Sequence, residues 1–442
     1  MRIDGRTPDQ PREVKIDVDF VRTADGSCLI ATGNTRVICT ASVEETVPPF
    51  LKGKGQGWIT AEYAMLPAST SQRKKRDGIK KDGRSVEIQR LIGRSLRQAV
   101  DLTKLGERTI TLDCDVLEAD GGTRTASITG AMVALTCAID KLIEQRKLLV
   151  SPIMHQVAAI SCGVVDQTPC LDLCYQEDSQ AQVDMNVVMN EKGEFIELQG
   201  TGEGRAFTAE ELHSLLHYGK CGIEQLMAAQ KEALGETARH ICPKPLLIAA
   251  TGNAHKLREL QHIFGEYYNV VSMYAAGFNA AIDENATTFA GNAAIKAEAV
   301  CEATGYPTIA DDSGLTVEAL DDEPGVYSAR YAAMNGEGEG DKDNNNLLLR
   351  RMKGKTRRQC AFQCAIALAI PGQVTRIAEG SCPGVLLEEE RGTGGFGYDP
   401  LFLYEPLNKT YAEMEDEEKL KFNHRSIACR KMLEIMKELN AQ

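Results

Sequence analysis

The chain has 442 residues and a formal net charge of −13, with 43% hydrophobic and 26% charged side chains. This length suggests two or three domains of roughly 100–200 residues each. Residues 1–240 and 241–442 are both acidic overall, which excludes nucleic-acid binding through bulk charge and leaves only a local basic patch for such a role. The fourteen cysteines form no Cys-x-x-Cys motif, and the first residues lack an apolar signal core. We therefore expect a cytoplasmic protein without a membrane span.

A domain boundary is predicted near residue 240. A helical pattern ends near Gly235, and Pro243 and Pro245 then disfavour helix. The apolar run that follows ends in Thr-Gly-Asn, as the first strand and first ligand loop of an α/β domain do. We predict one domain at residues 1–238, a linker at 239–245 and a second domain at 246–442.

The first domain begins with three alternating runs within residues 14–43, which predict a β-meander. Residues 88–99 follow helical spacing, and residues 110–116 alternate as a further strand. That strand leads through Gly-Gly-Thr-Arg at 121–124 into a long apolar helix at 128–142. Glycine amides, an arginine fork and a helix N-terminus favour a phosphate cradle. The alternative is a tight turn before a helix.

Two carboxylates and a basic loop complete the first candidate site. Asp178 precedes Asp184 by six residues, and Asp184 begins an apolar strand, where an unpaired carboxylate is costly to bury. Near a phosphate the two could hold Mg²⁺; the alternative is a pair of turn or strand-edge aspartates. Residues 73–84 carry seven cations and two aspartates. Such a run favours RNA contact but is also typical of a solvated loop.

Three segments, 82–94, 121–130 and 177–186, resemble the ribonuclease PH family, and the resemblance extends over residues 1–235. This family trims tRNA 3′ ends with inorganic phosphate as the attacking group. The resemblance implies an α+β domain with the ribonuclease PH-type β-α-β fold, similar to ribosomal protein S5 domain 2. It also implies a ring-shaped homohexamer whose basic loop, residues 73–84, faces the tRNA 3′ end.

The same resemblance implies site residues. Phosphate would be held by Arg84, Gly122, Thr123 and Arg124, with Ser127 nearby. Asp178 and Asp184 would be catalytic with the help of Mg²⁺. Because charge builds on oxygens that are already anionic, such a site needs arginines, backbone dipoles and a metal more than a strong base. General-acid and metal-ligand roles for the two aspartates both remain open.

The second domain repeats a strand, a Gly-Asn loop and a lysine. Residues 246–250 lead into this loop, and Lys256 follows at a helix start, where triphosphate oxygens could bind. The strand 308–310 ends in Asp-Asp-Ser-Gly at 311–314. Paired carboxylates at the carboxyl end of a strand, together with Glu284, could hold Mg²⁺ and activate water. The alternative is a plain Asp-Asp-Ser-Gly turn.

Five segments in order, 251–256, 310–315, 324–331, 392–400 and 423–425, resemble the inosine/xanthosine triphosphate pyrophosphatase (ITPase, Ham1-like) family. This family has a mixed-sheet α/β fold and cleaves ITP, dITP or XTP to a monophosphate and pyrophosphate. The resemblance implies Mg²⁺ at Glu284 and Asp312, with Asp312 as proton acceptor for water. It implies nucleotide contacts from Thr251, Gly252, Asn253, Ala254, His255, Lys256, Ser313, Phe396, Gly397, Tyr398, Asp399, Lys419, His424 and Arg425.

Two positions depart from this family's pattern. Ala286 stands where glycine is usual, and Asn423 where serine is usual. Neither change removes a charge, so we expect activity with altered affinity. The sequence as a whole predicts a bifunctional enzyme. The rival hypotheses are a non-catalytic RNA-binding ring scaffold for the first half, and a Maf-like pyrophosphatase of other modified nucleotides for the second.

Overall fold

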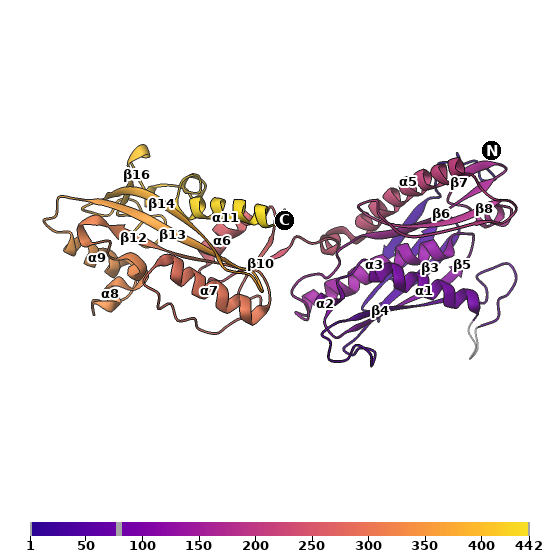
Figure 1. The fold of residues 1–442 in the computed structure, drawn as a ribbon, viewed down its shortest axis with the longest axis horizontal. Helices are drawn as coiled ribbons and strands as arrows, with labels where there is room; N and C mark the ends of the chain where they lie inside the picture. Colours follow the sequence, from indigo (N-terminus) through magenta and orange to yellow (C-terminus); the bar gives the residue numbers. More distant parts are fainter. Residues whose placement is uncertain (1, 77–81, 441–442) are drawn as a thin grey trace. The chain divides into compact units, whose positions relative to one another are not determined.

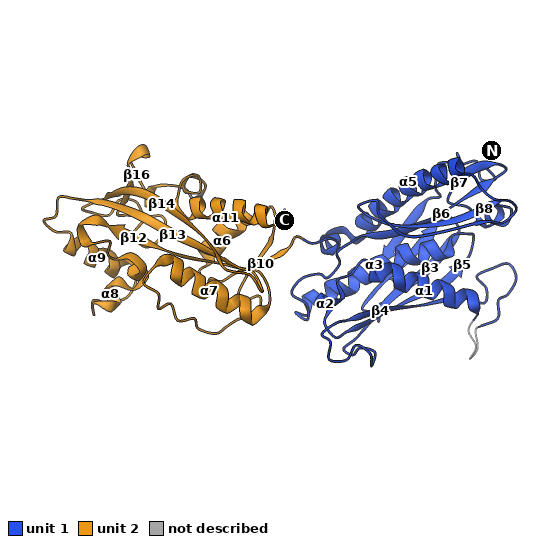
Figure 2. Ribbon diagram, viewed as in Figure 1, with its two compact units in different colours: residues 1–243 blue, residues 244–442 orange. Residues whose placement is uncertain are grey.

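The computed structural model describes residues 2–76 and 82–440, so residues 77–81 of the predicted basic loop lie outside the described part. Its internal contacts divide the chain into two compact units, Met1–Pro243 and Lys244–Gln442 (Figure 2). Each unit has its own sheets, helices and core, and each is described by itself.

Two sheets form the first unit. The first has the order β1-β2-β3-β5-β4, with β4 parallel to β5 and all other pairs antiparallel. Its strands are β1 (Val14–Val18), β2 (Gly26–Thr32), β3 (Thr35–Glu44), β4 (Trp58–Met65) and β5 (Thr109–Glu118). The second sheet is antiparallel with the order β7-β6-β8-β9. Its strands are β6 (Val157–Val165), β7 (Thr168–Leu171), β8 (Val183–Asn190) and β9 (Phe195–Gly202).

Helix α3 (Thr123–Glu144) is the centre of the first unit. It packs on β2 and β3 of one sheet and on β6 of the other (Figure 1). Among the described residues it is the one helix with the length and hydropathy of a membrane span. Most of it is buried, as in a core helix. The remaining helices of the unit are α1 (Gly83–Arg97), α2 (Leu102–Leu105), α4 (Tyr175–Asp178), α5 (Ala209–Leu234) and the 3₁₀ turn η1 (Gly235–His240).

One mixed seven-stranded sheet, in the order β11-β10-β12-β13-β14-β15-β16, forms the second unit. Strand β10 is parallel to both of its neighbours, β11 and β12, and the other pairs are antiparallel. The strands are β10 (Leu246–Ala249), β11 (Asn269–Ser272), β12 (Thr308–Val317), β13 (Gln359–Ala369), β14 (Arg376–Leu386), β15 (Phe402–Tyr404) and β16 (Lys409–Thr410).

Helices cover both faces of this sheet. Figure 1 shows α6 (Ala254–Phe264) and α11 (His424–Asn440) on one face and α7 (Phe289–Thr304) on the other. Three shorter helices, α8 (Tyr331–Met334), α9 (Asp341–Arg351) and α10 (Asp416–Lys419), complete the unit with 3₁₀ turns η2 (Glu318–Leu320), η3 (Gly325–Arg330), η4 (Glu405–Leu407) and η5 (Tyr411–Glu413). The predicted α/β fold class, with a mixed sheet in the second domain, is confirmed.

Two predicted boundaries were wrong. The long helix of the first unit starts at Thr123, because Gly122 adopts a left-handed conformation and serves as its N-cap. Strand β12 does not end at residue 310. It continues through Asp311 and Asp312, which pair with Ile366 and Ala365 of β13. An antiparallel partner supplies ladder hydrogen bonds along the whole segment and keeps it extended.

Candidate active sites

The Gly-Gly turn between β5 and α3 forms an anion cradle in the first unit. Gly121 and Gly122 have φ values of 77° and 65°, a region that favours glycine. A Cβ atom on Gly121 would lie 2.4 Å from the Leu173 carbonyl oxygen, so this position has no room for a side chain. Gly122 offers no side-chain cap to α3. The first N–H groups of this 22-residue helix are therefore available to an anion.

Two half-buried carboxylates and two arginines act on one another beside this cradle. Asp178 ends α4, and Asp184 is the second residue of β8. Burial raises the pKa of Asp178, although the positive charges of Arg84 and Arg124 oppose the rise. Burial, followed by the charge of Asp178, raises the pKa of Asp184 to about 6, and the same arginines again oppose it. Charged residues of α1, α3, α4 and β8 are thus close enough to interact electrostatically.

The other predicted phosphate residues differ in what their side chains do. The Thr123 hydroxyl lies 2.9 Å from the Tyr63 hydroxyl and is buried with it. The Ser127 hydroxyl is fully buried and donates to the Thr123 carbonyl at 2.8 Å, so it points into the helix instead of the cradle. Arg124 donates to Gln199 at 3.0 Å. In the basic loop, Arg73, Lys75 and Arg76 are exposed.

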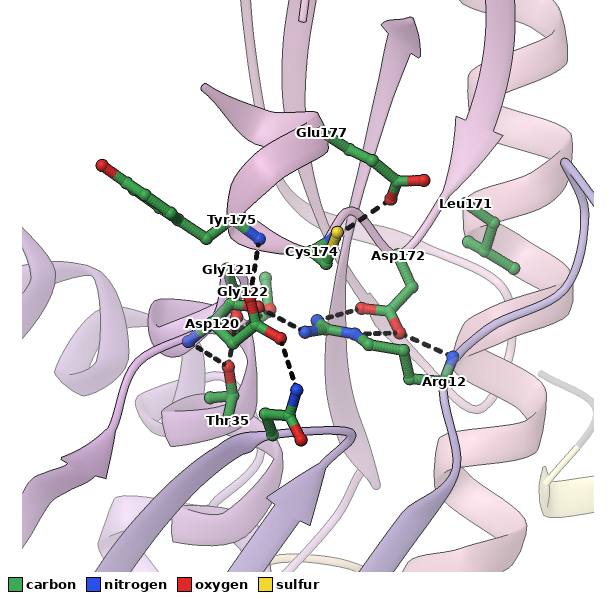
Figure 3. Close-up of polar contacts among 12 residues, drawn as sticks. Arg12, Thr35, Asp120, Gly121, Gly122, Leu171, Asp172, Cys174, Tyr175 and Glu177 are labelled. Atoms are coloured by element: carbon green, nitrogen blue, oxygen red, sulfur yellow. Dashed lines mark hydrogen bonds and ion pairs between the residues drawn. The ribbon is translucent and has the colours of Figure 1, made fainter. Parts of the chain in front are cut away.

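A buried ion pair behind the cradle was not predicted from the sequence. Arg12 donates to Asp172 from Nε at 2.9 Å and from Nη2 at 2.6 Å, and it also donates to the carbonyl of Asp120 (Figure 3). Arg2 donates to both carboxylate oxygens of Glu177, at 2.8 and 2.6 Å. These contacts join segments 108 to 175 residues apart in the chain, and no local pattern at either end indicates the pairing.

In the second unit, the predicted nucleotide residues converge on a pocket of about 560 Å³, a size typical of small-molecule sites. Its lining includes Thr251, Gly252, Asn253, His255, Lys256, Glu284, Ser313, Phe396, Gly397, Tyr398, Asp399, His424 and Arg425. Ala254 and Lys419 do not line this pocket. Lys419 lines a neighbouring hollow of about 290 Å³, to which His255 and Phe396 also contribute.

The adjacent carboxylates of β12 have opposite surroundings, because successive strand residues point to opposite faces. Asp311 lies 2.9 Å from the Lys256 ammonium on α6 and 3.1 Å from Nε of Arg425 on α11. Burial alone would raise the pKa of Asp311, but these two cations outweigh it and lower the pKa strongly. Asp312 faces α7, and burial raises its pKa despite Lys296. Asp311 therefore neutralises cations, while Asp312 is the more basic carboxylate.

Lys296 and Asn292 on α7 join the two predicted metal ligands. The Lys296 ammonium lies 2.7 Å from Glu284 and 3.4 Å from Asp312, so both carboxylates face one cationic point. Asn292 is 1% exposed; it donates to Oδ2 of Asp312 at 3.1 Å and accepts from the Ala286 amide at 2.9 Å. Hard oxygen donors converging on a cation suit Mg²⁺, which takes one or two carboxylates plus substrate phosphates. No group of three or more potential ligands occurs among the described residues.

The far end of the pocket is aromatic and cationic. The Phe396 ring is 39% exposed, and its centroid lies 5.9 Å from that of His255. The His424 ring stacks on Phe362 at 4.9 Å, and burial, then the charge of Arg425, lowers its pKa well below the usual value. Nδ1 of this neutral histidine has no hydrogen-bond partner among the described residues, which leaves a buried polar atom at the pocket wall.

The remaining residues around the pocket hold its walls. Burial raises the pKa of Asp399 to about 6, and Lys419, 3.4 Å away, opposes the rise. The Tyr398 hydroxyl donates to the Ser328 carbonyl at 2.9 Å. The amide oxygen of Asn423 accepts from the Ser426 amide at 2.7 Å. That contact caps α11 as a serine hydroxyl would, which explains why asparagine fits this position.

Comparisons with known proteins match the two units to two different families. Residues 10–139 and 155–221 match the models of domains 1 and 2 of the 3′ exoribonuclease family, and residues 247–435 match the Ham1 family model. Ribonuclease PH of Corynebacterium glutamicum (strain R) is 58% identical over 236 residues, which are 53% of this chain and 96% of that protein. The Ham1 structure from Staphylococcus aureus is 35% identical, covers 43% of this chain and 98% of its own, and has a TM-score of 0.41. The dITP/XTP pyrophosphatase structure from Mycobacterium abscessus is also 35% identical, covers 42% and 98%, and has a TM-score of 0.37.

The fold and the comparisons define a fusion of two enzyme domains, each with a loop that joins a strand to a helix beside paired carboxylates. The chain belongs to the ribonuclease PH family through its first unit and carries a Ham1-family domain as its second. It therefore joins a 3′-exoribonuclease domain to a nucleotide-hydrolysing domain of the Ham1/ITPase type. Both resemblances predicted from the sequence are confirmed.

Proposed function

We propose that the chain is a bifunctional enzyme that trims tRNA 3′ ends with inorganic phosphate and hydrolyses ITP, dITP or XTP. One observation carries the proposal. Each unit has a strand-to-helix junction that carries a cation, Arg124 or Lys256, beside a carboxylate whose pKa is raised by burial, Asp184 in the first unit and Asp312 in the second. Raised carboxyl pKa values next to anion-binding groups are typical of sites that move protons during phosphate chemistry.

In the first site, phosphate would bind to the amides at the start of α3 and to Arg84 and Arg124. A phosphate oxygen then attacks the last phosphodiester, the bond to the 3′ oxygen breaks, and a nucleoside diphosphate leaves. The arginines offset the charge of the attacking and scissile phosphates. Asp184, with a pKa near 6, holds a proton in a useful fraction of molecules at neutral pH and is suited to protonate the departing 3′ oxygen.

Mg²⁺ is the alternative partner of Asp178 and Asp184. Both carboxylates are half-buried, and the charge of Asp178 adds to the burial that raises the pKa of Asp184, so a divalent cation would relieve that repulsion. When bound, the ion would neutralise charge on the phosphates. A proton and a metal compete for the same oxygens, so the pH dependence of turnover with and without added Mg²⁺ separates the two roles.

The RNA substrate would reach this site along the basic loop. Arg73, Lys75 and Arg76 are exposed and precede α1, which carries Arg84 near its start. Phosphate contacts of this kind position RNA without reading its sequence. We further propose a homohexameric ring built by the first unit, and a cytoplasmic location, in keeping with fourteen free cysteines.

In the second site, Lys256 and the Thr-Gly-Asn loop, which both line the pocket, would bind the triphosphate. Asp312 would accept a proton from the attacking water, and its raised pKa makes it the better base of the Asp-Asp pair. Asp311 would keep Lys256 and Arg425 charged and in place. Mg²⁺ at Glu284 and Asp312 would supply charge neutralisation and lower the pKa of a bound water.

Recognition of the base would come from the aromatic end of the pocket. Phe396 offers a ring face for stacking. Adenine lacks the 6-oxo acceptor of hypoxanthine and xanthine, so a donor placed there would be left unpaired by adenine. Stacking plus a buried donor therefore favours non-standard purines over ATP.

Two assays on one preparation test the proposal. Purified protein with tRNA and inorganic phosphate is expected to release nucleoside diphosphates, and no release is expected without phosphate. The same protein with dITP or XTP and Mg²⁺ is expected to release pyrophosphate, with ATP and a panel of modified pyrimidine triphosphates as controls. A folded sample that is silent in one assay contradicts that half of the proposal, and a preference for modified pyrimidines would indicate a Maf-like activity.

A further inference from the structure

Asp120 lies between the phosphate cradle and the short helix that carries Asp178. Each of its polar groups takes part in a hydrogen bond. Its amide donates to the Thr35 hydroxyl at 2.9 Å, and its carbonyl accepts from Arg12. Its carboxylate accepts from the Tyr175 amide at 3.1 Å through Oδ1 and from the Asn34 side chain at 3.1 Å through Oδ2 (Figure 3). A single side chain therefore connects the β5–α3 turn to the segment at 175.

Each side of this connection leads directly to groups of the site. Tyr175 begins α4, and the last residue of that short helix is Asp178. On the other side, Asp120 is followed by the two glycines of the cradle. The Thr35 hydroxyl also donates to the Gly121 carbonyl at 2.7 Å, so the cradle is held by the same contacts. The hydrogen bond from Tyr175 thus ties the short helix that carries Asp178 to the residue that precedes the cradle.

The negative charge of Asp120 is unfavourable for phosphate binding nearby, so packing alone does not explain a carboxylate at this position. An acidic side chain two residues from a phosphate cradle repels the anion, so a neutral residue would favour phosphate binding if packing alone mattered. The carboxylate is instead committed to two N–H donors that approach from different segments. A carboxylate accepts both bonds without needing a particular proton arrangement, whereas a hydroxyl or an apolar side chain cannot reach both.

We propose that Asp120 is a positioning residue for phosphorolysis, which fixes the Asp178-bearing turn against the phosphate cradle and does not itself touch the substrate. This inference rests on the phosphorolytic function proposed above. It predicts that an acceptor at position 120, and not its charge, is what the site requires. Asp120→Asn keeps an oxygen for the Tyr175 amide, and the Asn34 amide can rotate to offer its oxygen to the new NH₂ group.

The test compares Asp120→Ala and Asp120→Asn in the full-length protein. Asp101→Ala is the matched control, because Asp101 also accepts from a backbone amide, that of Thr103 at 3.1 Å, at the start of the short helix α2. Two readouts are needed. Amide hydrogen exchange of residues 174–179 in the substrate-free protein reports the position of the turn. Steady-state kinetics with tRNA and phosphate separate kcat from the two KM values.

For Asp120→Ala, we expect exchange in residues 174–179 to accelerate by about tenfold or more, and kcat to fall by a similar factor, as the loss of a hydrogen bond to a charged acceptor predicts. The KM for tRNA should stay within roughly twofold, because Asp120 contacts no RNA-binding group. Asp120→Asn should restore both readouts, and Asp101→Ala should change neither.

Three results would overturn the proposal: unchanged exchange in Asp120→Ala, an equal loss of activity in Asp101→Ala, or an Asp120→Asn variant as impaired as Asp120→Ala. If the unmodified protein releases no nucleoside diphosphate, the proposed function fails. The exchange measurement still decides in that case whether Asp120 holds the turn, so the two failures are distinguishable.

Discussion

Replacing Asp311 by asparagine is expected to destabilise the second unit far more than the same replacement at Asp312. Asp311 is 1% exposed and lies within 3.1 Å of two cations, Lys256 and Arg425. Arg425 is itself buried, and once Asp311 is neutral it keeps the Glu259 carboxylate, at 2.8 Å, and the uncharged Ser313 hydroxyl, at 3.0 Å. Removing one partner of a buried ion pair typically costs roughly 3–5 kcal/mol, because the other charge stays buried without compensation.

That loss of free energy is large relative to the stability of a single domain. For a unit of this size, ~1 kcal/mol shifts the midpoint of thermal unfolding by roughly 2–4 °C, so Asp311→Asn should lower it by on the order of 10 °C. Asp312→Asn should change it little, because burial already disfavours the charged form of that carboxylate and raises its pKa. The two variants make the same replacement at adjacent residues on opposite faces of β12.

The single tryptophan makes the assay selective. Trp58 lies in β4 of the first unit, so its fluorescence reports that unit, while circular dichroism reports both. Asp311→Asn should shift a circular dichroism transition and leave the fluorescence transition unchanged. Equal destabilisation by the two variants, or a loss below about 1 kcal/mol for Asp311→Asn, would refute the assignment of Asp311 as the anchor of the two cations.

Three further predictions concern the RNA path, the water-activating site and pH. Replacing Arg73, Lys75 and Arg76 together by alanine should raise the KM for tRNA and leave the KM for phosphate unchanged. The slope of the logarithm of tRNA affinity against the logarithm of salt concentration should become shallower by roughly 0.7 per lost phosphate contact. Asn292→Leu should lower kcat for pyrophosphate release about tenfold with little change in nucleotide KM, because Asp312 and the Glu284 segment lose their common hydrogen-bond partner. Burial raises the pKa of folded Asp399 to about 6, above its unfolded value, so its contribution to stability is full at low pH and is lost as pH rises through 6. Urea titrations from pH 4 to 8 should therefore show a decline of up to about 3 kcal/mol in the second unit that Asp399→Asn abolishes.

Local patterns predicted the parts of both sites that are close together in the chain. The Gly-Gly-Thr-Arg turn at 121–124 and the loop at 251–256 join a strand to a helix, and each is recognisable because glycine conformation and helix capping act within a few residues. The fold class followed from the same patterns, since strand alternation and helical spacing differ in period.

Contacts across long sequence separations could not be read in this way. The pairing of Arg12 with Asp172, and of Asn292 with Asp312, depends on sheet order and helix placement, which no local spacing encodes. The full length of β12 could not be predicted from the sequence either. Polar residues such as Asp311 and Asp312 suggested a loop, but the antiparallel partner β13 and the cations on opposite faces satisfy them within the strand. Tertiary contacts overrode local preference at this point.

The central claim is that two independent active sites occupy separate units of one chain. The most direct test measures both activities in Asp184→Asn and in Asp312→Asn of the full-length protein. The first variant is expected to lose phosphate-dependent release of nucleoside diphosphates from tRNA and to keep release of pyrophosphate from dITP, and the second should show the reverse. Loss of both activities in either variant would contradict the claim, and so would a variant that keeps both activities.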